Sequence, residues 1–327
     1  MTAVSIVLPT FNRAEELPAA IESALEQTAP PDQYEILVVD NNSPDRTADT
    51  IAAIAAAHPG RVRYVFEKRQ GVSHARQAGI DAARAPLIAF FDDDVRVSRN
   101  WVETILRTFV EHPAIECIGG RVLPRWTTPP PGWLTPSHWA PLALQDFGDT
   151  SMIVSAENPR GLISANLACR KRLLDRIGGF SPQFQRVRDG IGSLEDDEWN
   201  RRLWKSGGTA LYVPDLITTT IVPATRLTRA YHRRWHRGHG RFYALLRAEE
   251  IERSTVGTLL GVPAHMYRAA LGEAAAWISA AMAGRMDEAF AHEVKLRFFR
   301  GFLGQRLSER LNPLASRAEL PLGSTPR

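Results

Sequence analysis

Three consecutive carboxylates, Asp92, Asp93 and Asp94, directly follow the apolar run 87–91. The run is short and rich in Ile and Phe, which is typical of a strand buried on both faces. In an open α/β sheet, ligands bind outside the carboxyl ends of the strands, where these acids would lie. Adjacent carboxylates repel one another, and a divalent cation that takes oxygen ligands would relieve that repulsion. On this tripeptide alone, a metal site and a solvated acidic turn both stay open.

A second acidic group, Glu-Asp-Asp-Glu at 195–198, precedes a stretch with apolar residues at helical spacing. We expect a helix over 195–204 that begins with Glu195 and Asp196. Acids near the first turn are favoured by the helix dipole, which is one sufficient reason for their presence. A carboxylate that acts as a general base is the other interpretation.

The elements that must position these acids alternate between strands and helices. We expect strands at 4–8, 35–39, 62–66 and 87–91, with helices between them. This rhythm predicts a parallel, doubly wound sheet, and the right-handed crossover rule leaves few other arrangements. Asn12, Asp40 and Asp92–Asp94 would then lie along one edge of the sheet. Further on we expect a helix at 98–111, strands at 115–123, 209–213 and 216–222, and helices from 225 onward.

The segment 124–141 holds six prolines and three tryptophans, one of which is Trp133. Its proline density argues against a helix or a central strand. Tryptophans on such a loop either stack on a sugar or anchor the loop to the body of the protein, and both interpretations stay open.

The bulk composition is that of an ordinary globular chain of 327 residues with 44% hydrophobic residues. Only two cysteines occur, which excludes a disulfide framework and fits a reducing compartment. The N-terminus has no basic region before its first apolar run, and no stretch holds 18 consecutive apolar residues. We therefore expect a cytoplasmic protein without a spanning helix.

Taken in this order, the motifs resemble those of the family 2 inverting glycosyltransferases with the GT-A fold, over about residues 3–222. The resemblance implies a doubly wound, mostly parallel mixed sheet flanked by helices, with a C-terminal helical extension. Residues 5–13 are similar to the family's opening strand and base-binding loop, and 71–79 to its segment over the nucleotide. Asp92-Asp93-Asp94 looks like its Asp-x-Asp motif, and Glu195-Asp196 like the acidic pair that supplies the base. The resemblance implies nucleotide contacts from Pro9, Thr10, Asn12, Arg13, Asp40, Arg76, Asp92 and Asp93, and sugar contacts from Asn166, Trp133 and Trp199.

The implied reaction moves a sugar from a nucleotide-diphosphate sugar, with a UDP-sugar favoured, to a hydroxyl of a glycan or lipid-linked acceptor. It would serve cell-surface polysaccharide or glycolipid synthesis and involve no nucleic acid. Mn²⁺ or Mg²⁺ held by Asp94 and Asp92 would stabilise the diphosphate leaving group. Asp196 would be the general base, and Glu195 would orient the acceptor or the loop.

One feature departs from the family pattern. Many members have a histidine shortly after the last sheet strand, whereas this chain has Thr218–Pro223 there. The nearest histidines, His232, His236 and His239, lie in a basic segment. A catalytically idle protein that binds nucleotide sugars or acts as a scaffold is therefore the alternative. A nucleotidyltransferase is disfavoured because Pro9–Arg13 lacks a glycine-rich basic loop.

The C-terminal third is predicted to be a separate basic and amphipathic region. We place domain limits at 1–222 for the nucleotide-sugar domain, 223–312 for the helical region and 313–327 for a loose tail. Residues 226–247 contain seven arginines and three histidines without an acid. Arginines near Trp277 and its small apolar neighbours are typical of a helix on an anionic leaflet. Peripheral association with the inner face of the cell membrane and a soluble helical cap are both open.

Overall fold

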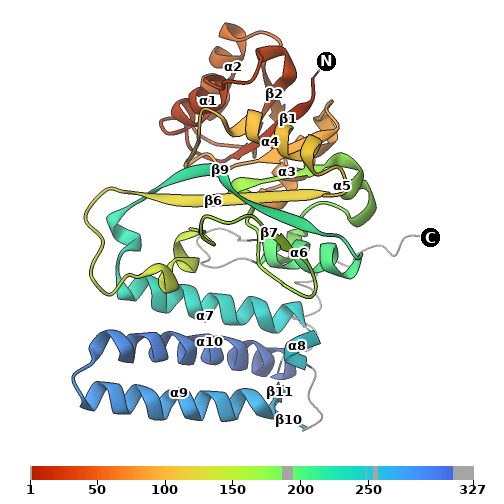
Figure 1. Cartoon of the computed structure of the whole chain (residues 1–327). Coiled ribbons are helices and arrows are strands. Elements are labelled where there is room, and N and C mark those ends of the chain that lie inside the picture. Colours follow the sequence, from red (N-terminus) through yellow and green to blue (C-terminus); the bar gives the residue numbers. More distant parts are fainter. Residues whose placement is uncertain (1, 186–193, 248, 253–256, 312–327) are drawn as a thin grey trace. The chain divides into compact units, whose positions relative to one another are not determined.

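The computed structural model describes residues 2–185, 194–247, 249–252 and 257–311 (Figure 1). They form two compact units, and each is described by itself. The sheet unit comprises residues 2–130, 136–185 and 195–223. The helical unit comprises residues 131–135, 194 and the described part of 224–311. The predicted tail at 313–327 lies outside the described residues.

The sheet unit is built on one mixed sheet in the order β3-β2-β1-β4-β8-β6-β9-β5, with β7 paired to β9. The strands are β1 (Val4–Thr10), β2 (Tyr34–Asp40), β3 (Val62–Phe66), β4 (Leu87–Phe90), β5 (Val95–Val97), β6 (Cys117–Trp126), β7 (Met152–Val154), β8 (Leu167–Arg170) and β9 (Ala210–Val222). The first four are mutually parallel, with Thr10 opposite Asp40 and Val7 opposite Phe90. The prediction that the ends of these strands meet at one edge is confirmed.

The other half of the sheet contains antiparallel strands, which confirms the mostly parallel, mixed sheet that the resemblance implies. β8 runs antiparallel between β4 and β6, and β8, β7 and β5 were not foreseen because they are short. The two strands expected at 209–213 and 216–222 form one long strand, β9, whose pairing with β6 shifts register at Gly120/Arg121. β6 also continues to Trp126 through Pro124, so the expectation of no strand there was wrong at its start.

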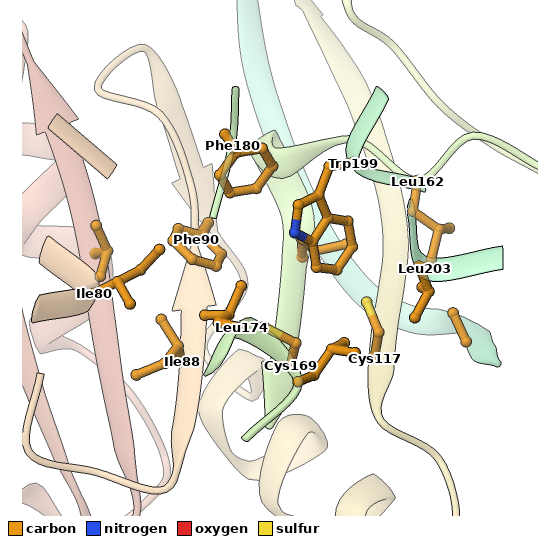
Figure 2. Close-up of a cluster of buried hydrophobic side chains, with 14 of the residues drawn as sticks. Ile80, Ile88, Phe90, Cys117, Leu162, Cys169, Leu174, Phe180, Trp199 and Leu203 are labelled. Carbon is orange, nitrogen blue, oxygen red and sulfur yellow. The ribbon is translucent and has the colours of Figure 1, made fainter. Parts of the chain in front are cut away.

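Helices cover the sheet and seal its core. They are α1 (Leu17–Leu25), α2 (Thr47–Ala57), α3 (Val72–Ala82), α4 (Trp101–Glu111), α5 (Lys171–Ile177) and α6 (Glu195–Lys205), with short 3₁₀ turns η1 (Pro31–Gln33), η2 (Pro136–His138), η3 (Ala140–Leu142), η4 (Ser164–Asn166) and η5 (Pro182–Phe184). Figure 2 shows the buried cluster in which Phe90 of β4 meets Phe180 and Trp199. The Phe90 and Phe180 rings meet edge-on at 5.4 Å, and Phe180 stacks on Trp199 at 5.6 Å. This packing attaches α6 to the strand that carries the three aspartates.

The helical unit contains η6 (Ala224–Arg226), α7 (Arg229–Leu246), α8 (Glu249–Glu252), β10 (Thr258–Leu259), β11 (Val262–Pro263), α9 (Ala264–Met282) and α10 (Met286–Leu311). α10 lies between α7 and α9 and packs against both (Figure 1). Ion pairs from Arg229 to Asp287 and from Arg247 to Glu309 show that α7 and α10 run parallel. None of the described helices is long and apolar enough to cross a membrane.

Glycines allow α7 and α10 to approach backbone to backbone. A Cβ added to Gly301 of α10 would lie 1.9 Å from the carbonyl oxygen of Arg237, and one on Gly240 would lie 2.0 Å from that of Phe298. Gly304, one turn further along α10, has no atom within 4 Å of the same position. The close crossing therefore depends on Gly240 and Gly301 and not on glycine in general.

Changing Gly301 to Ala should lower the thermal unfolding temperature, because the methyl group forces two backbones apart at a cost of about 1–3 kcal/mol. Gly304→Ala is the matched control. It should be neutral or stabilising by about 0.5–1 kcal/mol, since alanine favours the helix. Thermal unfolding followed by circular dichroism compares the two variants. Equal effects would mean that the α7–α10 crossing does not need Gly301.

Candidate active site

Polar side chains converge where the parallel strands end. Thr10, the last residue of β1, donates its hydroxyl to Oδ2 of Asp93 at 2.8 Å. Phe91 is fully buried, and the chain turns sharply after it, since the Val95 N–H donates to the Asp92 carbonyl at 3.0 Å. The three aspartates are therefore held, half-buried, between β4 and β5.

Burial and a neighbouring charge act on Asp93. Desolvation, followed by the charge of Asp94, raises the pKa of Asp93 to about 7, although the Thr10 hydroxyl and the Arg13 guanidinium oppose the shift. The cluster thus holds more negative charge than its protein surroundings neutralise. A cation placed beside it would be stabilised.

Asp40, at the end of β2, is buried and already has two donors. The Ser43 N–H reaches Oδ1 at 3.0 Å, and the Tyr64 hydroxyl reaches Oδ2 at 3.1 Å. Burial and the Asp40 carboxylate raise the pKa of Tyr64 to about 12. Asn12 adopts a left-handed φ of 55° and donates its N–H to Oγ of Ser43 at 2.9 Å. The loops after β1 and β2 are thereby joined beside Asp40.

Arg76 of α3 connects the aspartates to α6. Its Nη2 donates to Asp92 at 3.0 Å and its Nη1 to Glu195 at 3.3 Å, while the guanidinium lies 5.0 Å from the centre of the Phe180 ring. The side chain is only 3% exposed. Burial by itself would lower the pKa of Arg76, but the carboxylates of Asp92, Asp196 and Glu195 outweigh it and raise that pKa. Arg76 is thus the buried counter-charge of both acidic groups.

Asp196 has the properties of a proton acceptor. Desolvation, and next the charge of Glu195, raises the pKa of Asp196 to about 7, while Arg76 and a hydrogen bond from Ser164 oppose the shift. Oδ1 of Asp196 and Oε2 of Glu195 are both buried and have no hydrogen-bond partner. Unsatisfied buried carboxylate oxygens are costly and call for a functional explanation. Ser164 was missed from the sequence because its contact with Asp196 bridges segments that are distant along the chain.

The structure corrects two of the three predicted sugar contacts. Trp199 is fully buried in the core and donates Nε1–H to the Gly178 carbonyl at 3.2 Å, so it presents no face to a sugar. Asn166 is also fully buried. Its amide donates to the carbonyls of Arg121 and Leu216, and its oxygen accepts from Trp101 Nε1 at 2.8 Å.

Trp133 belongs to the helical unit. Its ring meets those of His232 and Phe290, each with centroids 5.0 Å apart, and the guanidinium of Arg229 lies 5.7 Å from its centre. These contacts favour the anchor that the sequence left open over a sugar platform.

The residues present fit a divalent cation only as a partial ligand set. Asp92 and Asp94 offer carboxylate oxygens, which Mg²⁺ and Mn²⁺ accept, and the crowding that raises the pKa of Asp93 would be relieved by the ion. Within the described ranges, no group of three or more His, Cys, Asp or Glu side chains could hold a metal ion. Water and diphosphate oxygens would have to supply the remaining ligands.

A shallow pocket of about 610 Å³ adjoins this edge. It is lined by Asn12, Ala14, Glu15, Glu16, Asp45, Arg46 and Thr50. The pocket lies beside the loops after β1 and β2, and none of the three aspartates lines it. It is thus separate from the acidic cluster.

Solved structures share the fold of this chain. A mannosyltransferase from Pyrobaculum calidifontis, in complex with GDP-Man and Mn²⁺, superimposes with a TM-score of 0.59 at 20% identity and covers 96% of this chain and 87% of its own. TarS 1–349 from S. aureus, in complex with UDP, superimposes with a TM-score of 0.54 at 15% identity. The match covers 95% of this chain and 92% of that structure. The mixed sheet with its flanking and C-terminal helices is the GT-A glycosyltransferase fold.

The family follows from the sequence match. The family model described as Glycosyl transferase family 2 matches residues 5–178, more than half of the chain, and the chain belongs to this family. Glycosyltransferase AglE of Haloferax volcanii is 25% identical over 214 residues, which are 65% of each protein. Glucosyl-dolichyl phosphate glucuronosyltransferase of the same organism is 25% identical over 190 residues, covering 57% of this chain and 58% of that protein. The match thus spans less than two thirds of either relative.

Asp196→Asn should stabilise the folded protein increasingly as the pH rises. The unfolded pKa of an aspartate is about 3.9, and that of folded Asp196 is raised to about 7. The contribution of this group is therefore fully present below the unfolded pKa and is lost as the pH rises through the folded pKa. The asparagine variant does not suffer that loss, so its advantage should grow from about pH 4 to pH 7 and then level off.

Denaturant unfolding at several pH values measures this difference. Asp175→Asn, at an exposed position on α5, is the matched control and should show no such trend. A pH-independent difference for Asp196→Asn would contradict the raised pKa.

Proposed function

We propose that this protein is an inverting, metal-assisted glycosyltransferase that moves a sugar from a nucleotide-diphosphate sugar to an acceptor hydroxyl. The observation that carries the proposal is the buried Asp196 carboxylate, whose Oδ1 has no hydrogen-bond partner and whose neighbour Glu195 is joined through Arg76 to Asp92. A base close to an acidic diphosphate site is what direct displacement at an anomeric carbon requires. A scaffold that only binds nucleotides would not need this base.

In the proposed reaction, Asp196 accepts the proton of the acceptor hydroxyl. The hydroxyl oxygen forms a bond to the anomeric carbon while the bond from that carbon to the diphosphate oxygen breaks. The electron pair leaves with the nucleoside diphosphate, and the configuration at the anomeric carbon inverts. A pKa near 7 suits this task, because Asp196 is then available as a base near neutral pH.

The donor is proposed to occupy the carboxyl edge of β1, β2 and β4. Asp40 and the loop at Pro9, Thr10, Asn12 and Arg13 would receive the nucleotide. Asp94, with Asp92, would hold a Mn²⁺ or Mg²⁺ ion, whose chemistry is to stabilise negative charge on the departing diphosphate. The bound Mn²⁺ and GDP-Man of the Pyrobaculum enzyme and the UDP of TarS support a nucleotide donor of this kind.

The acceptor is proposed to be a glycan or a lipid-linked sugar. The Haloferax relative is named a glucosyl-dolichyl phosphate glucuronosyltransferase. That name refers to a lipid-linked sugar and supports a lipid-linked acceptor here. A lipid-linked acceptor would require the enzyme to work at a membrane surface, as a peripheral protein at the inner face of the cell membrane. A UDP-sugar stays the favoured donor.

Asp196→Asn should lower kcat by about a hundredfold to ten-thousandfold while donor binding persists. Because the base must be ionised, kcat/KM of the wild type should rise with pH through about 7 and then level off. Turnover is measured as release of nucleoside diphosphate from a panel of nucleotide sugars with Mn²⁺, and binding by thermal shift.

Asp175→Asn is the control and should match the wild type. Full turnover by Asp196→Asn would show that Asp196 is not the general base. Release of pyrophosphate instead of nucleoside diphosphate would show that the enzyme transfers a nucleotide and not a sugar.

Arg76 is proposed to position and charge-balance Asp92 and Glu195. Arg76→Met should shift the pH dependence of kcat/KM to higher pH, because Arg76 lowers the pKa of Asp196 against the effects of burial, Glu195 and Asp92. Arg107→Met, at an exposed site on α4, is the control. A raised KM for the donor with an unshifted pH profile would instead favour the direct diphosphate contact that the family resemblance implies.

A further inference from the structure

The helical unit carries an unusual concentration of exposed apolar side chains. Seven of the thirteen large apolar side chains that are exposed in the described ranges lie between Leu259 and Met286. Leu271, Ile278 and Met282 of α9 are 71%, 50% and 85% exposed. Their spacing of seven and four residues places them on one face of the helix. We call this face the α9 stripe.

The opposite face of α9 is packed against α10. Glu273 binds His292 at 2.6 Å and Lys295 at 2.8 Å, and the rings of Tyr267 and Phe299 meet at 5.2 Å. Glu273 is the only acid in α9, and it is engaged on this inner side. The α9 stripe therefore carries no negative charge.

Positive charge is concentrated in the same unit. Residues 224–311 hold fifteen basic and eight acidic side chains, whereas the net charge of the whole chain is only +4. On α7, Arg234, Arg237 and Arg241 are exposed and recur at spacings of three and four residues. They form one basic face of that helix.

Contacts extend this basic face onto α10. Glu293 accepts from Arg233 of α7 and from Arg297 of its own helix, both at 2.7 Å. Arg300, exposed one turn after Arg297, follows on the same side. We call the exposed Arg234, Arg237, Arg241 and Arg300, together with Arg297, the arginine face.

Helical geometry relates the stripe to the arginine face. Glu293 and Lys295 are two residues apart and so point to nearly opposite sides of α10. Glu273 of α9 reaches the Lys295 side. Leu271, Ile278 and Met282 lie roughly opposite Glu273 around α9, so the stripe faces away from Lys295, on the outer side of the unit.

We propose that the α9 stripe and the arginine face together bind the surface of an anionic lipid bilayer, with α9 lying in the interface. An exposed apolar helix face and clustered arginines in one unit are the combination that such a surface selects. A second copy of the chain is disfavoured as the occupant, because it would bring two strongly basic units together. The inference deepens the proposed function, since it supplies the surface on which a lipid-linked acceptor would be met.

The test is co-sedimentation of the full chain with vesicles of phosphatidylcholine, with and without phosphatidylglycerol. Wild-type protein should bind the anionic vesicles, bind neutral vesicles far less, and be released by salt, which screens charge beyond a few Å. The triple variant Leu271→Ser, Ile278→Ser, Met282→Ser should lose about a hundredfold in affinity, because three apolar side chains no longer enter the interface. Arg237→Gln, Arg241→Gln, Arg300→Gln should lose a similar factor and most of the salt dependence.

Matched controls come from the sheet unit. Val110→Ser with Ile153→Ser removes exposed apolar side chains, and Arg84→Gln, Arg99→Gln, Arg107→Gln removes three exposed arginines. Both controls should bind vesicles like the wild type. Nucleotide binding, followed by thermal shift, should be unchanged in every variant, which separates this inference from the proposed function.

Several outcomes would overturn the proposal. These are no binding of the wild type to anionic vesicles at low salt, equal binding to neutral vesicles, or an equal loss in the sheet-unit controls. A dimer in light scattering that the α9 variant dissociates, without vesicle binding, would assign the stripe to a second copy. If vesicle binding fails while nucleotide binding persists, the transferase proposal stands without this surface.

Discussion

The site depends on the buried guanidinium of Arg76, whose positive charge is shared between two acidic groups. Arg76 is almost fully enclosed, and burying a guanidinium is tolerated only when carboxylates face it. Asp92 and Glu195 supply those carboxylates, and the partners Arg76 and Glu195 are 119 residues apart in the chain. The fold therefore brings the acidic turn after β4 and the start of α6 together around one guanidinium. Asp196 lies beside the same counter-charge, which lowers its pKa, but burial and the charge of Glu195 outweigh that effect and raise the pKa of Asp196 to about 7.

The sheet explains why these two acidic groups can meet. β1, β2 and β4 are parallel, so their polar ends form one edge. β8 then joins β4 antiparallel, and the 3₁₀ turn that holds Ser164 and Asn166 leads directly into it. The Asn166 amide donates its hydrogen bonds to backbone carbonyls there, whereas Ser164 forms a hydrogen bond with Asp196. Buried, hydrogen-bonded groups thus surround the carboxyl group that we propose as the base, as a pre-organised site requires.

The helical unit follows different physical rules from the sheet unit. Its inner contacts are a close glycine crossing, aromatic stacking and ion pairs that use many of its acids. Its surface exposes apolar side chains on α9 and clustered arginines on α7 and α10. Folding alone does not require these exposed groups, because the opposite helix faces already supply the packing. Their arrangement is better explained by a partner that is both apolar and anionic.

The sequence by itself determined the alternation of strands and helices up to β4, the meeting of Asn12, Asp40 and the three aspartates at one edge, and the family. These features are encoded locally, in apolar periodicity and in motifs read in order. Only the tertiary structure decided that Trp199 and Asn166 are buried, that Trp133 packs within the helical unit, and that Arg76 faces Asp92 and Glu195. The antiparallel strands β7 and β8 were also beyond the sequence. The reason is physical: burial and ion pairing depend on which distant segments pack together, and spacing along one element carries no record of that choice.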